Sequence, residues 1–95
     1  MTGNRYNVHP KTIESAVEIL MESLSTDQLN QIKQLEEDDL WEVHMSLGQG
    51  IRNSMGLWGI NKELLKSCGS EDMHPDDASS AIVKFVWLKL RHEIK

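Results

Sequence analysis

The segment from His44 to Trp58 contains the side chains best suited to bind a charged ligand. Arg52 is its only residue with a fixed charge, and the other positions are glycine, apolar or weakly polar. A guanidinium presents a planar set of donors that pairs with a carboxylate or a phosphate. With about 100° between successive residues of a helix, Trp41, Gly48 and Arg52 share one flank. An isolated charge in such surroundings requires a partner, either inside or outside the domain.

Two interpretations of Arg52 follow. In the first, Gly48 opens a shallow pocket walled by Trp41, and Arg52 and Asn53 present donors there to a carboxylate, a phosphate or a partner's backbone. In the second, Arg52 pairs with the domain's own acidic residues or with loop carbonyls, since buried polar groups are generally satisfied internally. Trp58 stands in a glycine-flanked turn, and either holds this turn down or faces another chain. The candidate binding residues are Trp41, His44, Gly48, Arg52, Asn53 and Trp58.

His44 falls on the apolar side of the same helix, where a histidine is either a core residue or a proton carrier. Asp72, His74, Asp76 and Asp77 form a close cluster of residue types that bind metals. Their spacing matches no zinc or calcium motif, and helix capping accounts for both Asp76 and Asp77. We therefore predict no catalytic residue, no metal and no cofactor. The alternative is a small metal-assisted or hydrolytic enzyme that uses His44 with Asp76 or Asp77, which requires them to converge on a pocket.

Other motifs that define a function class do not occur in this sequence. The glycines match neither phosphate-binding pattern, so nucleotide binding has no support. A single cysteine, Cys68, cannot form an internal disulfide and fits a reducing compartment. No apolar run approaches the roughly 20 residues of a membrane span, and the N-terminus lacks the layout of a signal peptide. We expect a cytoplasmic protein that does not enter the membrane.

Helical periodicity organises the first half of the chain. Apolar residues recur at helical spacing from Ile13 to Leu24, and again from Leu29 to Leu35. Between them, Ser25 to Gln28 matches the S-x-x-Q capping box, which predicts that a second helix begins at this point.

A third helix is expected from Leu40, with Asp39 and Glu42 spaced as an N-cap and its N3 partner. Gly48 and Gly50 lie inside it, and each costs about 1 kcal/mol relative to alanine. Two such glycines indicate either close packing of the backbone or an early end to the helix.

The second half of the chain predicts two further helices. A short one runs from Asn61, as N-cap, to about Cys68, with Gly69 ending it. The last runs from Pro75 to His92, and its apolar stripe is wide enough to place it at the centre of the fold. The predicted fold is all-α: an irregular bundle of four to five helices with the C-terminal helix central. We expect residues 1–95 to form a single helical domain with a flexible segment at 1–9 and a structured turn over 48–59.

The charge is unevenly distributed along the chain. The whole sequence carries a net charge of −5, yet the part from Glu14 to Glu42 holds nine acidic residues and only Lys33, a charge of −8. The positive residues Lys84, Lys89, Arg91 and Lys95 gather at the C-terminus. This distribution argues against nucleic-acid binding and suits a basic patch on a protein partner. The simpler interpretation is that these charges are solvated helix faces.

Four short motifs carry a resemblance to a known family. They are Leu47-Gly48, Ile51-Arg52-Asn53, Gly56-Leu57-Trp58 and the run HPDDAS that begins at His74. From about residue 10 to about residue 90 the chain resembles an uncharacterised family of small bacterial helical domains, a domain of unknown function. The resemblance implies a bacterial or phage setting and transfers no catalytic role. It draws attention to His44, Arg52, Asn53 and Asp77.

The sequence as a whole favours binding over catalysis. We predict a non-enzymatic protein-binding module of the adaptor or inhibitor type, which engages a protein partner or forms a homo-oligomer. Small acidic helical proteins often act in this way, which is an argument from analogy. The predicted surface is either the acidic face of the first two helices or the region of Arg52, Asn53 and Trp58.

Overall fold

A computed structural model describes residues 10–57 and 61–91. Within these residues there are five α-helices, one 3-10 helix and no strand. The helices are α1 (Ile13–Ser23), α2 (Thr26–Gln34), η2 (Glu37–Asp39), α3 (Leu40–Ser54), α4 (Lys62–Cys68) and α5 (Pro75–Leu90). The segment 1–9, expected to be flexible, and the candidate residue Trp58 lie outside the described residues. No helix in the described part has the length and apolar character needed to cross a membrane.

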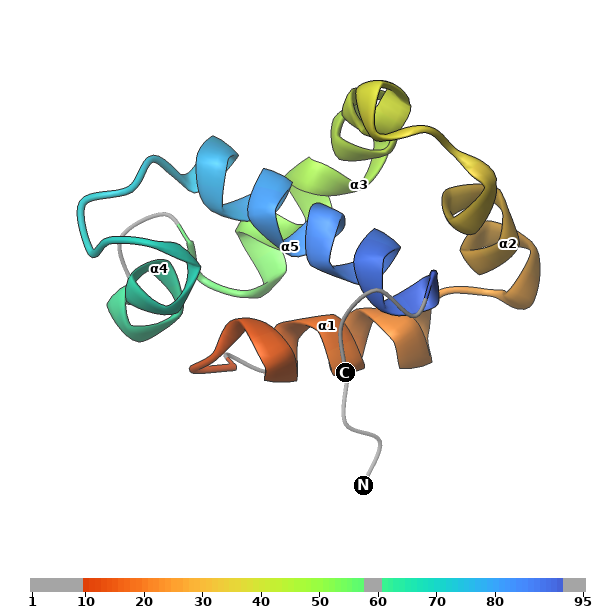
Figure 1. Ribbon diagram of the computed structural model, residues 1–95. Helices are drawn as coiled ribbons and strands as arrows, with labels where there is room; N and C mark the ends of the chain where they lie inside the picture. The colour runs from red at the N-terminus through yellow and green to blue at the C-terminus, as the bar shows by residue number, and fades with distance from the viewer. Residues whose placement is uncertain (1–9, 58–60, 92–95) are drawn as a thin grey trace.

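The last helix, α5, lies at the centre of the fold. It contacts α1, α2, α3 and α4, and passes between α1 and α3 in Figure 1. Its buried side chains spread around much of the helix, as a helix packed on several sides requires: Ala78, Ser79, Ile82, Val83, Val86 and Trp87. The predicted all-α bundle with a central C-terminal helix is therefore confirmed. The described helix ends at Leu90, and the predicted last residue, His92, lies outside the described part.

Local capping fixes where the first two helices begin. The Thr12 side chain accepts a hydrogen bond from the backbone of Ser15 at the start of α1. At α2 the predicted capping box is confirmed: Ser25 Oγ accepts from Gln28 N at 3.1 Å, and Gln28 Oε1 accepts from Ser25 N at 2.9 Å. Two of the backbone donors that the start of the helix leaves open are thus satisfied within four residues.

The start of α3 differs from the prediction. Asp39 makes no capping hydrogen bond with its side chain, so the proposed Asp39 and Glu42 cap is wrong. The physical reason is its backbone, with φ −97° and ψ 0°, which continues the 3-10 turn of η2 into the helix. An N-cap side chain reaches the first turn from an extended backbone, and Asp39 does not have one.

The glycines at 48 and 50 do not end α3, which continues to Ser54. The helix closes at Gly56, whose φ of 73° is a left-handed conformation suited to glycine. Leu57 N donates to Arg52 O at 3.1 Å across this turn, and Met55 and Leu57 are fully buried on either side of it. Of the structured turn predicted over 48–59, residues 48–54 are instead part of α3, and residues 55–57 form a turn anchored in the core.

Asn61 ties three parts of the chain together. Its Oδ1 accepts from Leu64 N at 3.2 Å, which confirms the predicted cap of α4. Its Nδ2 donates to Pro10 O at 2.7 Å and to Met55 O at 3.0 Å. The residue is buried, so these bonds satisfy backbone carbonyls that water does not readily reach.

Candidate functional site

Four polar side chains meet where α3 crosses the start of α5, and we call them the α3–α5 cluster: His44, Arg52, Asp76 and Ser79. Arg52 Nη1 lies 2.7 Å from Asp76 Oδ1 in an ion pair. His44 Nε2 lies 2.7 Å from Ser79 Oγ and 3.9 Å from Asp76 Oδ1. The cluster therefore brings two of the predicted binding residues together with Asp76 of the alternative, enzymatic hypothesis.

Local structure on both helices positions these groups. His44 and Arg52 are two turns apart on α3, with Gly48 between them on the same face. On α5, Pro75 occupies the first turn, and His74 caps the helix by accepting from Asp76 N at 3.0 Å through Nδ1. This cap fixes the first turn of α5, where Asp76 lies.

Gly48 is required by the close approach of its neighbours. A Cβ built at this position would lie 2.8 Å from His44 Cδ2 and 2.9 Å from Arg52 Nη1. Contacts this short force the ring and the guanidinium to move. The space that the glycine leaves is thus filled by the protein's own His44 and Arg52.

The substitution Gly48→Ala is expected to lower the free energy of unfolding by up to about 2 kcal/mol. Overpacking costs about 1–3 kcal/mol, and the gain in helix propensity offsets about 1 kcal/mol of it. Gly50→Ala is the matched control, because nothing lies within 4 Å of a Cβ there. That variant should gain about 1 kcal/mol. Urea denaturation of both proteins measures the difference, and equal effects at the two positions would contradict this explanation of Gly48.

Ser79 links both helices of the cluster through its hydroxyl group. The hydroxyl donates to the backbone carbonyl of Asp76 at 3.0 Å. Ser79 Oγ also lies 2.7 Å from His44 Nε2 and 3.5 Å from Arg52 Nη1. Which group donates between His44 and Ser79 depends on the tautomer of the imidazole ring.

Solvent access separates the members of the cluster. Ser79 is 0 % exposed, and the side chains of His44 and Arg52 are 20 % and 17 % exposed. Asp76 is more open, at 56 %. A hydroxyl sealed in this way does not reach a substrate, so the arrangement joins α3 to α5 and leaves only the edge of the cluster in contact with solvent.

Cys68 offers no readily available nucleophile either. It is a half-buried free cysteine, and burial raises the pKa of its thiol to about 11. The thiolate is the reactive form, so the group is almost entirely protonated near neutral pH.

Trp41 and Met45 lie on the outer side of α3, next to the cluster. Trp41 is 59 % exposed and Met45 is 73 % exposed. Beside Trp41 is a hollow of about 240 Å³ between η2, α3 and α5. Its lining residues are Glu37, Leu40, Trp41, His44, Ser80, Val83 and Lys84.

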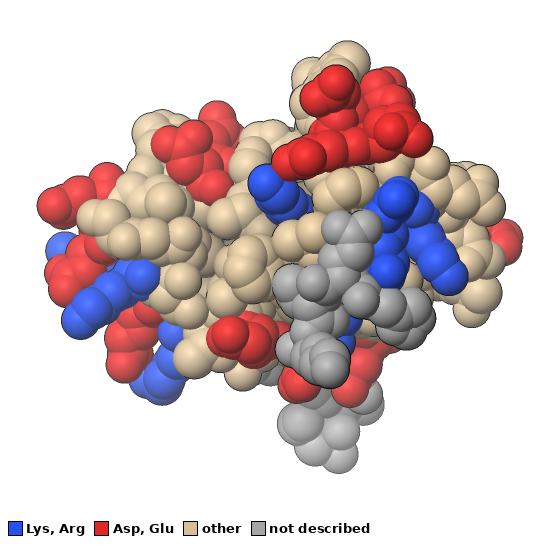
Figure 2. Space-filling model, in the orientation of Figure 1, with Lys and Arg blue, Asp and Glu red and all other residues tan. Residues whose placement is uncertain are grey.

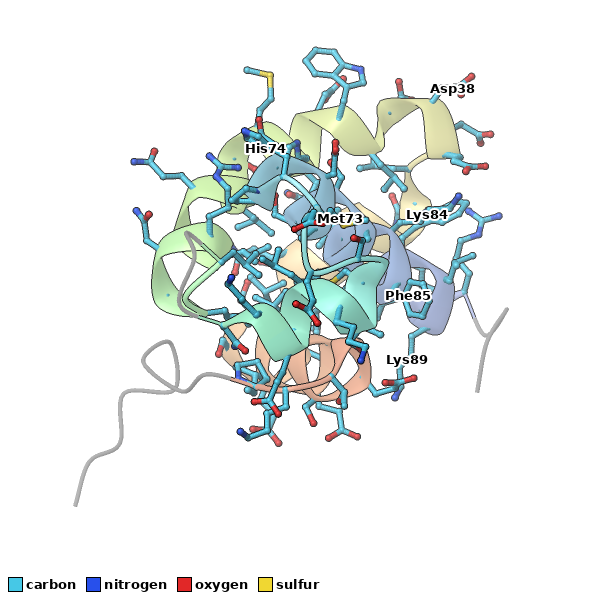
Figure 3. All side chains as sticks on the ribbon, turned by 90° about the vertical axis from the view of Figure 1, so that its left-hand side faces the viewer. Asp38, Met73, His74, Lys84, Phe85 and Lys89 are labelled. Atoms are coloured by element: carbon cyan, nitrogen blue, oxygen red, sulfur yellow. The ribbon has the colours of Figure 1, made fainter. Side chains whose placement is uncertain are left out.

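Charged side chains surround this hollow. Lys84 Nζ and Glu37 Oε2 form an ion pair at 2.8 Å between α5 and η2. Figure 3 shows Lys84 and Asp38 on the same side of the molecule. Acidic side chains gather at the top of Figure 2, where η2 and the start of α3 lie. The surface near Trp41 is therefore predominantly acidic.

Comparison with known proteins identifies the family. Residues 9–90 match the family described as a domain of unknown function, DUF6794. The chain belongs to this family. No curated protein and no solved structure shows a significant match. The function of this DUF6794 domain is therefore inferred from its α3–α5 cluster and from the exposed residues of α3.

The DUF6794 structure unites some of the predicted site residues and separates others. His44 and Arg52 belong to the α3–α5 cluster, Gly48 lies between them, and Trp41 stands beside the cluster. Asn53 is exposed near the end of α3, and Asp77 is exposed in the first turn of α5. Within residues 10–57 and 61–91, no group of three or more metal-binding side chains is placed to hold an ion.

Two contributors were not anticipated from the sequence of this DUF6794 domain. Ser79 bonds to His44 across 35 positions of the chain, and no local signal marks such a contact. Met45 does have a signal, because it follows Trp41 by four residues and so shares its face of α3. That spacing could have extended the candidate surface to Met45.

Proposed function

We propose that this domain is a non-enzymatic protein-binding module, and that it binds through the exposed side of α3. The observation that carries the proposal is the exposure of Trp41 and Met45, the large hydrophobic side chains that are exposed in the described part of the chain. They stand one turn apart and form what we call the Trp41–Met45 surface. A cytoplasmic and bacterial setting, as expected from the sequence, is part of this proposal.

The chemistry of the two side chains supports a protein interface. Tryptophan supplies a large apolar area and is enriched among residues that dominate binding energy. Methionine is flexible and polarisable, so it adapts to different partner surfaces. The hollow beside Trp41, with Leu40 and Val83 on its walls, has room for one anchoring side chain of a partner.

The acidic residues around Trp41 indicate the charge of the partner segment. Glu36, Glu37, Asp38 and Asp39 precede Leu40 and Trp41, and Glu42 follows Trp41. A segment with an apolar side chain flanked by lysine or arginine therefore fits this surface. A second copy would bring the same acidic side chains against one another, and a nucleic acid would bring its phosphates. Both would be repelled.

The alternative, a hydrolytic or metal-assisted enzyme, has less support. His44 and Asp76 do approach each other, but Asp76 is paired with Arg52 and His44 is hydrogen-bonded to a serine that is fully buried. Asp77, the other residue of this hypothesis, is exposed in the first turn of α5. The contacts of Asp76 with Arg52 and of Ser79 with His44 join α3 to α5, which supports a structural role for the cluster.

The double variant Trp41→Ala, Met45→Ala tests the proposal. In affinity capture from cells of the source organism, the parent should retain a protein with a basic surface, and the double variant should lose it. Purified parent and partner should then bind directly, and less tightly as salt is raised. Exposed substitutions change stability by only about 0.5 kcal/mol, so both proteins should remain folded by circular dichroism.

Lys66→Ala, an exposed change on α4, is the control and should retain the partner. Equal capture by the double variant and the parent would refute a role for the Trp41–Met45 surface. The charge argument would be contradicted if the protein that only the parent captures is acidic and its binding to the parent does not depend on salt.

A further inference from the structure

The opposite flank of α3 borders a second and larger hollow. A volume of about 520 Å³ lies between α2 and α3, and a volume of about 230 Å³ continues from it between α1 and α3. The two share Ser46 and Leu47 in their linings, so they meet along α3. We call the combined hollow the α3 trough. The α3 residues of its lining lie about 100–280° around the helix from Trp41, so the trough is centred on the opposite side of α3 and only Glu42 borders both surfaces.

The trough has an apolar floor and polar rims. Ile32, Leu35, Val43 and Leu47 form much of the floor, while Gln28, Gln31 and Gln34 follow one another along α2. From Glu42 to Ser54 the lining follows α3 for about 18 Å. This length corresponds to about three turns of a second helix.

Gly50 is the residue that the fold itself does not explain. It lies inside α3, where glycine is unfavourable, and yet a Cβ there would meet no atom within 4 Å. Gly48, two residues earlier, has close neighbours inside the molecule, whereas Gly50 has none. Gly50 lines the trough, so the close approach that it permits is from outside the molecule.

Charge complementarity identifies the kind of ligand. No lysine or arginine lines the trough, and Glu42 is its one charged lining residue. Its walls come from α1, α2 and α3, and the sequence from Glu14 to Glu42 carries nine acidic residues against Lys33. Cationic side chains on the ligand would be attracted, whereas a second copy would bring the same acidic segment to the contact.

From these observations we propose that the α3 trough binds a cationic amphipathic helix of a partner protein, which places its apolar side on the trough floor and its backbone against Gly50. This is the helix-in-groove mode of recognition, in which apolar residues at i, i+3, i+4 and i+7 act as anchors. The proposal goes beyond the Trp41–Met45 surface and does not depend on it. With both surfaces the domain is an adaptor that holds two segments on opposite sides of α3.

Binding of synthetic helical peptides to the full chain tests the inference. The probe is a peptide of about 14 residues with leucines at those spacings and lysines elsewhere. One control has the same composition in scrambled order, and another replaces every lysine with glutamate. Only the cationic amphipathic peptide should shift the amide NMR signals of Leu47, Gly50 and Ser54. No binding by this probe, or equal binding by the controls, would overturn the proposal.

Matched variants locate the binding. Gly50→Leu fills the trough and should weaken binding about tenfold or more, while its exposed neighbour Gln49→Leu, outside the lining, should change it less than about twofold. A Gly50→Leu variant that binds normally would refute the site. Signal shifts confined to residues 41 and 45 would support the Trp41–Met45 surface and refute the trough. Shifts that appear on raising the protein concentration without peptide would indicate self-association, against the proposal.

Discussion

Replacing Asn61 with alanine is expected to lower the free energy of unfolding by about 3–7 kcal/mol. The change removes the cap of α4, at a cost of about 1 kcal/mol. It also leaves the carbonyls of Pro10 and Met55 without the Asn61 amide, and each buried unsatisfied group costs about 1–3 kcal/mol. Urea denaturation followed by circular dichroism measures the loss.

One control separates the α4 cap from the amide hydrogen bonds of Asn61, and a second measures the effect of an exposed asparagine. Asn61→Asp keeps an oxygen that can accept from Leu64 N but has no amide to donate, so it should be as destabilising as alanine or more. Asn30→Ala, an exposed change on α2, should shift stability by only about 0.5 kcal/mol. A stable Asn61→Asp protein would show that the amide bonds to Pro10 and Met55 are unimportant.

Replacing Trp87 with alanine should cost about 3–5 kcal/mol, as is usual for a buried aromatic side chain in a core. Trp87 is buried on α5, and its indole Nε1 donates to Leu35 O at 2.9 Å at the end of α2. The Arg91 guanidinium lies over the ring at 4.9 Å from its centroid, and its Nη1 also donates to Leu35 O at 3.4 Å. The same residue therefore fills the core and joins α2 to the central helix.

Trp87→Phe distinguishes these two roles. Phenylalanine retains an apolar ring but cannot donate to Leu35 O, and the loss should be about 1–2 kcal/mol. Thermal denaturation of the three proteins should therefore order them as parent, phenylalanine variant and alanine variant. If phenylalanine costs as much as alanine, the hydrogen bond and not the packing holds α2 in place.

Short-range signals made the helices predictable. The capping box at Ser25 and Gln28, the cap at Asn61 and the proline at the start of α5 each act within a few residues, so their partners can be found from the sequence. The wide apolar stripe of α5 likewise predicted its central place, because a helix buried on several sides leaves few positions for polar residues.

Contacts between distant segments could not be predicted in the same way. The η2 turn replaces the expected cap at Asp39, since the backbone conformation there is set by how α2 and α3 are joined. The bond between His44 and Ser79 depends on the packing of α3 against α5. The internal partner of Arg52 was one of two interpretations, and only the fold identifies Asp76.

The two glycines of α3 show most clearly what the sequence pattern alone could not predict. In sequence Gly48 and Gly50 look alike, and both suggested close packing or an early end to the helix. In the fold Gly48 makes room for His44 and Arg52, while Gly50 borders open space. The difference arises from the tertiary neighbours of each position, which the helical periodicity does not contain.

The central claim is that the outer side of α3 is a docking surface for a basic protein segment. Its most direct test is photo-crosslinking in cells, with a photoreactive amino acid at position 45 and, as a control, at the exposed position 66 on α4. We predict a discrete adduct from position 45, joined to a basic segment of one partner, that disappears in a Trp41→Ala background and is absent from position 66. Adducts of equal yield at the two positions, or none at position 45 in cells that contain the protein, would contradict the claim.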